Sequence, residues 1–179
     1  MLLTKKEILG LIEDGKLVQN LKDKEVQVQQ CGVDLTASKL FTLKGKGRLD
    51  FSNRDRLIPE YKEVEFENDE WDIKPGVYHV AMNEKIVLPE NIAGLLLPRS
   101  SALSCGLEVH SALWDPGYEG RSFIHVNVSR ELKLFENARI AQMVFYKLTG
   151  KTEAYKGIYK NEDITTHGER GNTGHQNQK

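Results

Sequence analysis

Three polar clusters lie within a β-rich stretch between residues 97 and 142, and together their residue types suit a nucleotide. Arg99, Ser100 and Ser101 form the first, in which a guanidinium fork beside two hydroxyls can surround phosphate oxygens from two sides. In the second, a tight Pro-Gly turn holds Asp115 close to Tyr118, which suits a general base beside a sugar or a nucleobase. The third cluster ends in Gln142 and adds an amide. The sequence therefore predicts a nucleotide site.

Each cluster also has a simpler interpretation when it is taken alone. An arginine in a serine-rich turn is typical of a solvated surface, and Asp-Pro-Gly is typical of an ordinary hairpin with glycine at positive φ. The order of the three clusters within one β-rich region favours the functional interpretation, because they supply an anion clamp, a general base and an amide.

The composition limits the classes of protein to be considered. A chain of 179 residues, 39% of them hydrophobic, can build one core, and a second folded domain is not expected. The net charge of -1, from 25 basic and 26 acidic residues, gives no field that attracts DNA or RNA, so no nucleic-acid partner is expected. No apolar run approaches the ~20 residues of a membrane helix, and the first residues lack a signal-peptide pattern, which predicts a cytoplasmic protein with no membrane partner. The two cysteines are expected to be buried.

Hydrophobic periodicity indicates the elements that must position the clusters. A capping box from Thr4 to Glu7, an apolar face that includes Ile8, and a stop at Gly15 predict a short helix over residues 4–15. From residue 26 onward, β-branched and aromatic residues recur between turns, which predicts strands at 26–28, 33–35, 40–43, 77–81, 92–97, 107–109, 123–128 and 141–148. Many short strands indicate a mainly β protein, either a barrel or a sandwich.

The remaining segments are expected to be connections. Residues 44–47 predict a hairpin tip, and the acidic residues 60–72 predict an excursion over the surface. The chain becomes polar after Lys156. We therefore expect a single domain over residues 1–160 and a flexible tail over 161–179, which could close over a ligand.

Four ordered motifs resemble the dUTPase and dCTP deaminase superfamily. They are residues 29–35 with Cys31-Gly32-Val33-Asp34-Leu35, the Arg99-Ser100-Ser101 run, residues 110–120 around Asp115, and residues 139–145 from Arg139 to Phe145. The segment 3–15 is similar to the N-terminal helix of the deaminase branch, and the resemblance covers roughly residues 1–160. It implies a distorted β-barrel or jelly-roll of the dUTPase-like type, assembled as a homotrimer in which neighbouring subunits complete each site.

The residues that distinguish the branches favour hydrolysis over deamination. Deaminases of this superfamily carry a glutamate proton shuttle about ten residues after the turn aspartate, where this chain has His125. They also carry arginines where it has Ser104 and Leu113, so no obvious group remains to move protons to a leaving amine. The short interval between Ser100 and Asp115 resembles the archaeal-type, dCTP deaminase-like dUTPases. This resemblance implies hydrolysis of dUTP to dUMP and pyrophosphate, which would remove dUTP from the nucleotide pool.

The resemblance also implies a role for each candidate site residue. Asp115 would activate the water that attacks the α-phosphorus, and Tyr118 would pack against deoxyribose and exclude a 2'-hydroxyl. Arg99, Ser100, Ser101 and Gln142 would bind the phosphates, and Ser111 and Tyr159 would add substrate contacts, with uracil read by backbone groups of residues 108–113. Magnesium (Mg2+) would bridge the phosphates, and Asp34 would support it through water.

Two features depart from the dUTPase pattern and leave alternatives open. Residues 168–174 are a partial match to the glycine-rich closing arm and lack its aromatic, while Tyr155-Lys156-Gly157-Ile158-Tyr159 resembles a Tyr-x-Gly-x-Tyr segment of the deaminase branch. The alternatives are a dCTP deaminase, a bifunctional enzyme that makes dUMP from dCTP, or a catalytically silent nucleotide-binding protein. A fourth possibility is a β-barrel interaction module.

Overall fold

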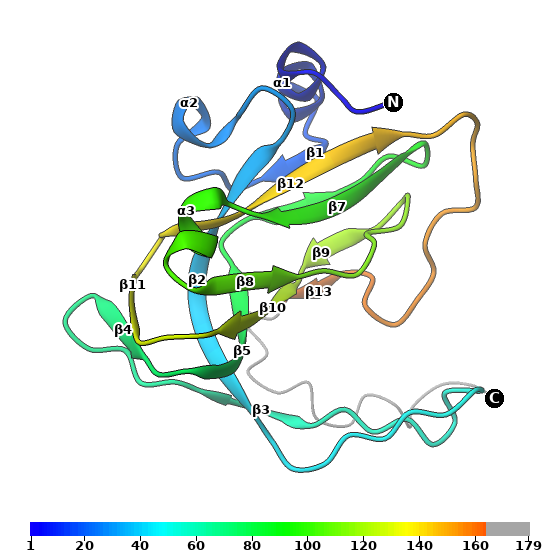
Figure 1. The fold of residues 1–179 in the computed structure, drawn as a ribbon. Helices are drawn as coiled ribbons and strands as arrows, with labels where there is room; N and C mark the ends of the chain where they lie inside the picture. The colour runs from blue at the N-terminus through cyan, green and yellow to red at the C-terminus, as the bar shows by residue number, and fades with distance from the viewer. Residues whose placement is uncertain (164–179) are drawn as a thin grey trace.

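The computed structural model describes residues 1–163, which form a mainly β protein with three short helices (Figure 1). The helices are α1 (Lys5–Glu13), α2 (Lys24–Gln27) and α3 (Ser100–Ser104). The first strands are β1 (Leu17–Gln19), β2 (Val33–Lys44), β3 (Glu60–Glu63), β4 (Glu70–Ile73), β5 (Gly76–Met82), β6 (Lys85–Val87) and β7 (Ile92–Pro98). They are followed by β8 (Leu107–His110), β9 (Glu119–Arg121), β10 (Phe123–Val128), β11 (Leu132–Phe135), β12 (Arg139–Lys147) and β13 (Glu162–Asp163).

The largest sheet is strongly curved and carries both parts of the candidate site. Its strands lie in the order β7-β12-β2-β5-β10-β8, all antiparallel, with β3 paired to the far half of β2. The end strands β7 and β8 contact each other, so the sheet forms a nearly closed barrel. Smaller sheets, β1-β6-β9-β13 and β4-β11, extend it. The expected mainly β fold with a distorted barrel is confirmed.

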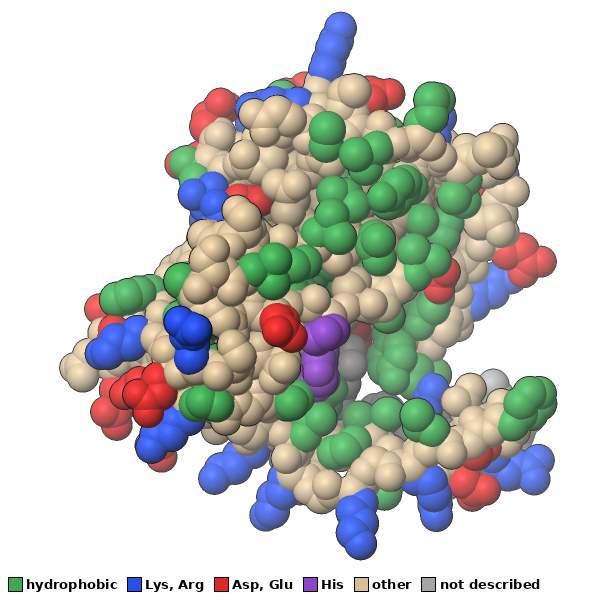
Figure 2. Space-filling view, in the orientation of Figure 1, with side chains coloured by type: hydrophobic (Ala, Val, Ile, Leu, Met, Phe, Trp, Pro, Cys, Tyr) green, Lys and Arg blue, Asp and Glu red, His purple; other side chains and the backbone are tan. Residues whose placement is uncertain are grey.

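The core of the barrel consists of alternating inward side chains. Fully buried residues include Leu35 and Leu40 on β2, Ile124 on β10, and Met143 and Phe145 on β12. Alternation along a strand sends every second side chain inward, so the neighbouring positions are free to face solvent or a ligand. The outer face over β7 and β12 is apolar as well (Figure 2), and Leu97 and Tyr146 are 45% and 40% exposed there.

The N-terminal helix is confirmed. It runs from Lys5 to Glu13 with Thr4 as its N-cap, within the expected residues 4–15. The capping box forms, because the backbone N–H and the hydroxyl of Thr4 donate to Oε2 of Glu7 at 2.9 and 2.7 Å. Ile8 is completely buried and anchors the helix to the barrel.

Several expected connections are different in the structure. Residues 24–27 form the helical turn α2, not part of a strand, because the Asp23 carboxylate accepts from the N–H groups of Glu25 and Val26. The strands expected at 33–35 and 40–43 are one strand, β2, with a register shift near Ala37. Both cysteines are exposed rather than buried.

The hairpin tip predicted at residues 44–47 and the acidic excursion predicted at residues 60–72 both contain more structure than expected. β2 and β3 do pair, but a long loop over residues 45–59 joins them, closed by a bridge between Arg48 and Leu57. The acidic segment contains β3 and part of β4, in which Trp71 is buried at 3% exposure. A strand with one buried face can carry acidic residues on the other, which explains the misleading composition.

The end of the described chain returns to the barrel. β13 pairs in parallel with β9, and its residues lie beyond the expected domain boundary at 160. The closing arm expected at residues 168–174 lies outside the described residues. Within residues 1–163, the helices are all too short to cross a membrane.

Candidate functional site

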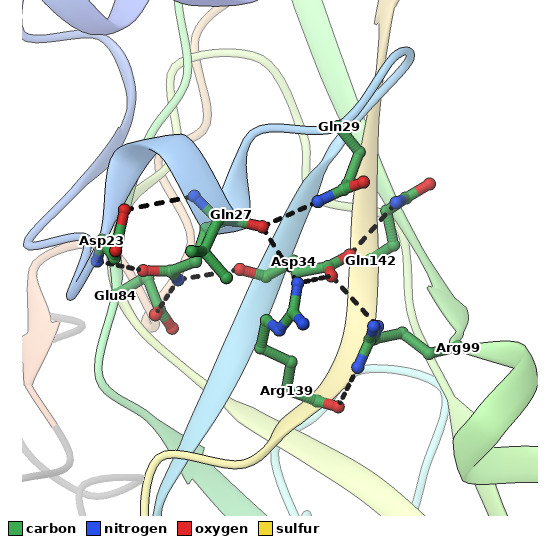
Figure 3. Close-up of polar contacts among 9 residues, drawn as sticks. Asp23, Gln27, Gln29, Asp34, Glu84, Arg99, Arg139 and Gln142 are labelled. Carbon is green, nitrogen blue, oxygen red and sulfur yellow. Dashed lines mark hydrogen bonds and ion pairs between the residues drawn. The ribbon is translucent and has the colours of Figure 1, made fainter.

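A buried carboxylate, Asp34, joins the ends of β2, β7 and β12 (Figure 3). Asp34 lies opposite Gln142 in the pairing of β2 with β12, and Arg99 directly follows β7. The Nε of Arg99 lies 3.0 Å and Nη1 of Arg139 lies 3.2 Å from Oδ2 of Asp34. The side-chain amide of Gln142 donates to Oδ1 at 3.1 Å. Strand register therefore brings together three of the predicted residues, Asp34, Arg99 and Gln142.

This cluster, the Asp34 clamp, carries a net positive charge. Asp34 is only 1% exposed, whereas the side chains of Arg99 and Arg139 are 28% and 32% exposed. Two guanidinium groups on one carboxylate leave one positive charge uncompensated, and both arginines still reach solvent. Ser100 and Ser101, both exposed, begin α3 immediately beside Arg99. The arrangement suits an anion with several oxygens, such as a phosphate chain.

A second buried carboxylate, Glu84, supports the strand that carries Asp34. Its Oε2 accepts the backbone N–H of Thr36 at 2.9 Å, and its Oε1 accepts the Thr36 hydroxyl at 2.6 Å and the Gln27 amide at 2.7 Å. Gln27 also donates to the backbone carbonyl of Asp34 at 2.9 Å. Burial raises the pKa of Glu84, although the hydrogen bonds from Thr36 and Gln27 oppose this shift.

Asp115 lies on a separate cavity of ≈ 340 Å³. It is exposed, whereas Tyr118, which lines the same cavity, is 5% exposed and donates from its hydroxyl to Glu162 at 3.1 Å. Tyr155 and Tyr159 also line the cavity, and the rings of Tyr118 and Tyr155 lie 5.7 Å apart. Burial raises the pKa of Tyr155. The volume and the mixture of rings and polar groups suit a small organic ligand.

The turn that presents Asp115 has the geometry expected from its sequence. The N–H of Tyr118 donates to the carbonyl of Asp115 at 3.1 Å, and Gly117 has a φ of +76°, as in a type II turn with proline before glycine. A Cβ on Gly117 would lie 2.7 Å from Cβ of Ala154. Glycine is therefore required here by both the dihedral angle and the close approach of the chain.

Three histidines also line the cavity. His79 on β5, His125 on β10 and His110 on β8 are direct cross-strand neighbours. Nε2 of His79 lies 3.2 Å from Nδ1 of His125. Burial lowers the pKa of His125, and the nearby His110 lowers it further.

The Asp34 clamp and the turn of Asp115 meet β7 at different positions in one chain. Trp114, next to Asp115, bridges to Gly94, whereas Arg99 follows the end of the strand. Gly94 and Arg99 are five residues apart along the extended chain, which is roughly 16 Å at about 3.3 Å per residue. The structure therefore divides the predicted site residues into two groups: Asp34, Arg99, Ser100, Ser101 and Gln142 at the clamp, and Ser111, Asp115, Tyr118 and Tyr159 at the cavity.

The hydroxyl of Ser111 makes two hydrogen bonds within the protein. Its hydroxyl donates to the carbonyl of Ala112 at 2.6 Å and accepts from the N–H of Leu96 at 3.4 Å. These contacts shape the segment that follows β8. Ser111 therefore lines the cavity with a hydroxyl that already has protein partners.

The clamp fits a magnesium ion only as an indirect support. No three His, Cys, Asp or Glu residues within 1–163 are arranged to hold a metal ion. Oδ2 of Asp34 contacts two arginines, whereas Oδ1 accepts only from Gln142 among the described contacts. Oδ1 therefore keeps a lone pair for a further donor. Magnesium commonly keeps several waters and binds through substrate phosphates and few carboxylates, so this donor set is compatible with a phosphate-bound ion.

Sequence reasoning assigned no role to several residues at the two sites. Arg139 belongs to the fourth motif, and an arginine beside a predicted phosphate site could have been named as a ligand from the sequence. Its pairing with Asp34 appears only through strand register. His79 and Glu162 lie in no motif, and β5 and β13 bring them to the cavity.

Comparison with known proteins relates this chain to enzymes of deoxynucleotide metabolism. A Methanocaldococcus jannaschii protein named deoxyuridine 5'-triphosphate nucleotidohydrolase is 41% identical over 157 residues, which cover 86% of this chain and 98% of the relative. A Methanosarcina acetivorans protein named "Probable deoxyuridine 5'-triphosphate nucleotidohydrolase" is 41% identical over 167 residues, covering 90% and 98%.

A solved structure shares the fold. The 2'-deoxycytidine 5'-triphosphate deaminase from Agrobacterium tumefaciens matches with a TM-score of 0.61 at 22% identity, over 80% of this chain and 47% of that chain. The family model described as dCTP deaminase-like matches residues 2–148. With most of its length matched by this model and by relatives at 41% identity, the chain belongs to the dCTP deaminase-like family.

Proposed function

We propose that this protein hydrolyses dUTP to dUMP and pyrophosphate. The observation that carries the proposal is the cavity in which Asp115, a carboxylate exposed to water, lies beside the buried ring of Tyr118. The relatives named deoxyuridine 5'-triphosphate nucleotidohydrolase, which this chain matches over 98% of their length, support this substrate. A cytoplasmic location, where dUTP would arise, is part of the proposal.

Asp115 acts as the general base of the reaction. Its carboxylate accepts a proton from a water that attacks the α-phosphorus, the bond from the α-phosphorus to the oxygen bridging to the β-phosphorus breaks, and pyrophosphate leaves. The Tyr118 ring packs against deoxyribose, where a 2'-hydroxyl finds no room. At the other group of residues, Arg99, Arg139 and Gln142 bind the phosphate chain together with Ser100 and Ser101.

Magnesium is the proposed cofactor, held by the substrate phosphates with Asp34 as its indirect support. When it is bound, the ion neutralises charge as the phosphates separate. Asp34 contributes by orienting Arg99, Arg139 and Gln142.

A homotrimer is proposed because the two groups of site residues meet β7 at different positions. The roughly 16 Å of strand between Gly94 and Arg99 favours a site in which the clamp of one copy meets the cavity of another. The exposed apolar face over β7 and β12, with Leu97 and Tyr146, offers a surface on which copies can associate (Figure 2). A head-to-tail ring of copies completes every site in the same way.

The test is to incubate the protein with magnesium and either dUTP or dCTP, and to measure dUMP, pyrophosphate and ammonia. We expect dUMP and pyrophosphate from dUTP. Asp115→Asn should lower kcat by at least about 100-fold and leave nucleotide binding within about threefold, because the amide keeps the shape and loses the base. Asp72→Asn, at an exposed position on β4, is the matched control and should be unchanged.

Other outcomes separate the alternatives. Ammonia from dCTP would indicate a deaminase or a bifunctional enzyme. Binding of either nucleotide without any product would indicate a silent nucleotide-binding protein. Full turnover in Asp115→Asn would remove this residue from the mechanism.

A further inference from the structure

The row of three histidines is the part of the cavity to which the proposed reaction assigns no role. His125 lies directly opposite His79 on one side and His110 on the other, so the three side chains share one face of the sheet. The rings of His79 and His125 are 5.0 Å apart, and those of His110 and His125 are 5.6 Å apart. All three line the cavity that contains Asp115 and Tyr118.

The contact between His79 and His125 links their protonation. At 3.2 Å between Nε2 of His79 and Nδ1 of His125, one nitrogen must donate and the other must accept. Two N–H groups facing each other would repel, and two lone pairs would gain nothing. If His79 donates, a neutral His125 carries its own proton on Nε2, the nitrogen on the other side of the ring. His79 thereby sets the tautomer of His125.

The surroundings of His125 favour its neutral form. Burial lowers its pKa, and the nearby His110 lowers it further. Its nearest strand neighbours contribute His79 from β5 and His110 with Glu108 from β8, where Glu108 and His110 are 3.8 Å apart. Across the cavity lie the remaining titratable groups, which are Asp115, Tyr118, Tyr155, Tyr159 and Glu162. Glu162 accepts the Tyr118 hydroxyl, and the described partner of His125 is another imidazole.

The position of His125 suits recognition of the base. β10 pairs with β8, and His125 lies opposite His110, where the chain leaves β8 for the segment 111–113 that lines the cavity. With the sugar against Tyr118, as proposed above, the base of the nucleoside shares a cavity whose lining includes His125. The exocyclic group on the base then meets an imidazole edge.

We propose that His125, with His79 donating to its Nδ1, presents Nε2–H to the 4-carbonyl oxygen of bound uracil and thereby selects uracil over cytosine, which carries an amino group at this position. This inference rests on the proposed function and extends it to the choice of base. A carbonyl oxygen completes the hydrogen bond, whereas the amino group of cytosine opposes one donor with another. Leaving two buried donors unpaired disfavours cytosine.

The test measures binding, so it does not depend on turnover. Calorimetry with magnesium and the α,β-imido analogues of dUTP and dCTP gives the two dissociation constants. For His125→Phe, which keeps a planar ring without the donor, we expect the constant for the uracil analogue to rise at least about tenfold and that for the cytosine analogue to change less than about twofold. His79→Phe should likewise raise the dissociation constant for the uracil analogue more than that for the cytosine analogue. Asn127→Ala, also on β10 but outside the cavity, is the control and should change neither.

The tautomer is measured independently on the wild-type protein. Nitrogen-15 spectra of the histidine side chains, assigned with His125→Phe, should show the Nε2–H form of His125 in the complex with the uracil analogue. The Nδ1–H form, a charged His125, or equal losses for both analogues in His125→Phe would overturn the proposal. Selective binding without hydrolysis of dUTP would contradict the proposed function and leave the role of His125 supported. Failure to bind either analogue would contradict both.

Discussion

Asp34 is a carboxylate almost inaccessible to water that nevertheless keeps two arginines in contact with solvent. A buried charge is stable only when it is paired and hydrogen-bonded, and here Arg99, Arg139 and Gln142 provide that compensation. The carboxylate in turn holds the guanidinium groups close together although they repel each other. The result is a clamp that is already assembled before a phosphate arrives, so little ordering cost remains for binding.

Arg139 is the residue at which this arrangement can be tested. Arg139→Ala removes one of the two cations while Arg99 still pairs with Asp34, so the clamp loses its net positive charge. We expect kcat/KM for dUTP to fall by at least about tenfold, mainly through KM, because a charge-assisted contact to phosphate is lost. Steady-state kinetics with dUTP measure this effect.

Two further variants show whether charge or geometry is responsible. Arg139→Lys keeps the charge but loses the planar guanidinium group, whose Nη1 now donates to both Asp34 and the carbonyl of Val26, so it should recover only part of the activity. Arg130→Ala, at an exposed arginine before β11, should behave as wild type. A value for Arg139→Ala within twofold of wild type would exclude Arg139 from phosphate binding.

The sequence predicted the site at the level of individual residue types. Asp115, Arg99 and Gln142 were identified because their chemistry is visible in local motifs, and the turn at Gly117 follows from local dihedral preference. The separation of these residues into a clamp and a cavity was not predictable, because it depends on which part of β7 each motif meets. Contacts such as His79 with His125 require strand register, which alternation alone does not supply.

At the scale of elements, Glu84 joins three segments that come together behind the clamp. It follows β5, and its oxygens bind Thr36 on β2 and Gln27 on α2. Gln27 also accepts from the N–H of Asp23 at 3.0 Å, which fixes the start of α2. The carboxylate is completely buried, so each of these donors would be left unpaired without it.

Glu84 gives the fold a dependence on pH that can be measured. Its pKa in the folded protein is raised by burial, so the native state binds its proton more tightly than the unfolded chain does. The free energy of unfolding contributed by this group must therefore fall as the pH rises from its ordinary value of 4.5 through the raised pKa. Urea unfolding between pH 4.5 and pH 8 gives the free energy of unfolding of wild type and of Glu84→Gln. The difference between these two free energies should decline as the pH rises.

The variant also has an expected effect at neutral pH. An amide can replace one carboxylate oxygen as acceptor, but its NH2 group then faces a donor from Thr36, which should cost about 1–3 kcal/mol. Glu90→Gln, at an exposed position before β7, is the control. A stability difference that stays constant or grows from pH 4.5 to pH 8 would contradict the raised pKa.

The elements themselves were predictable where one local signal dominates. The capping box located α1, and runs of β-branched, aromatic and other apolar residues between turns located β5, β7, β10 and β12. Short strands such as β6 and β9 were not predicted, because three residues are too few to show a hydrophobic period. Residues 26–28 were misassigned because Val26 and Val28 resemble a strand, whereas the Asp23 cap favours a helical turn at a lower entropic cost.

At the scale of the whole molecule, the nearly closed barrel separates two half-sites along one strand. The clamp lies beyond the end of β7 next to α3, and Trp114, which lines the cavity, bridges to Gly94 nearer the start of that strand. A triphosphate chain is shorter than the roughly 16 Å of strand between Gly94 and Arg99. If the site is formed between copies, the two half-sites need not come from the same chain.

This separation predicts that two inactive variants restore each other. Copies with Arg99→Ala keep Asp115, and copies with Asp115→Asn keep the clamp, so a ring that contains both types holds some sites with both parts intact. In a 1:1 random mixture obtained by co-expression, about a quarter of the sites should be complete, because each half is intact with a chance of about one half. We expect roughly that fraction of wild-type kcat per chain, from particles with the mass of a trimer by light scattering. Activity no higher than that of the separate variants, or a monomeric mass with full wild-type activity, would mean that the site is completed within one chain.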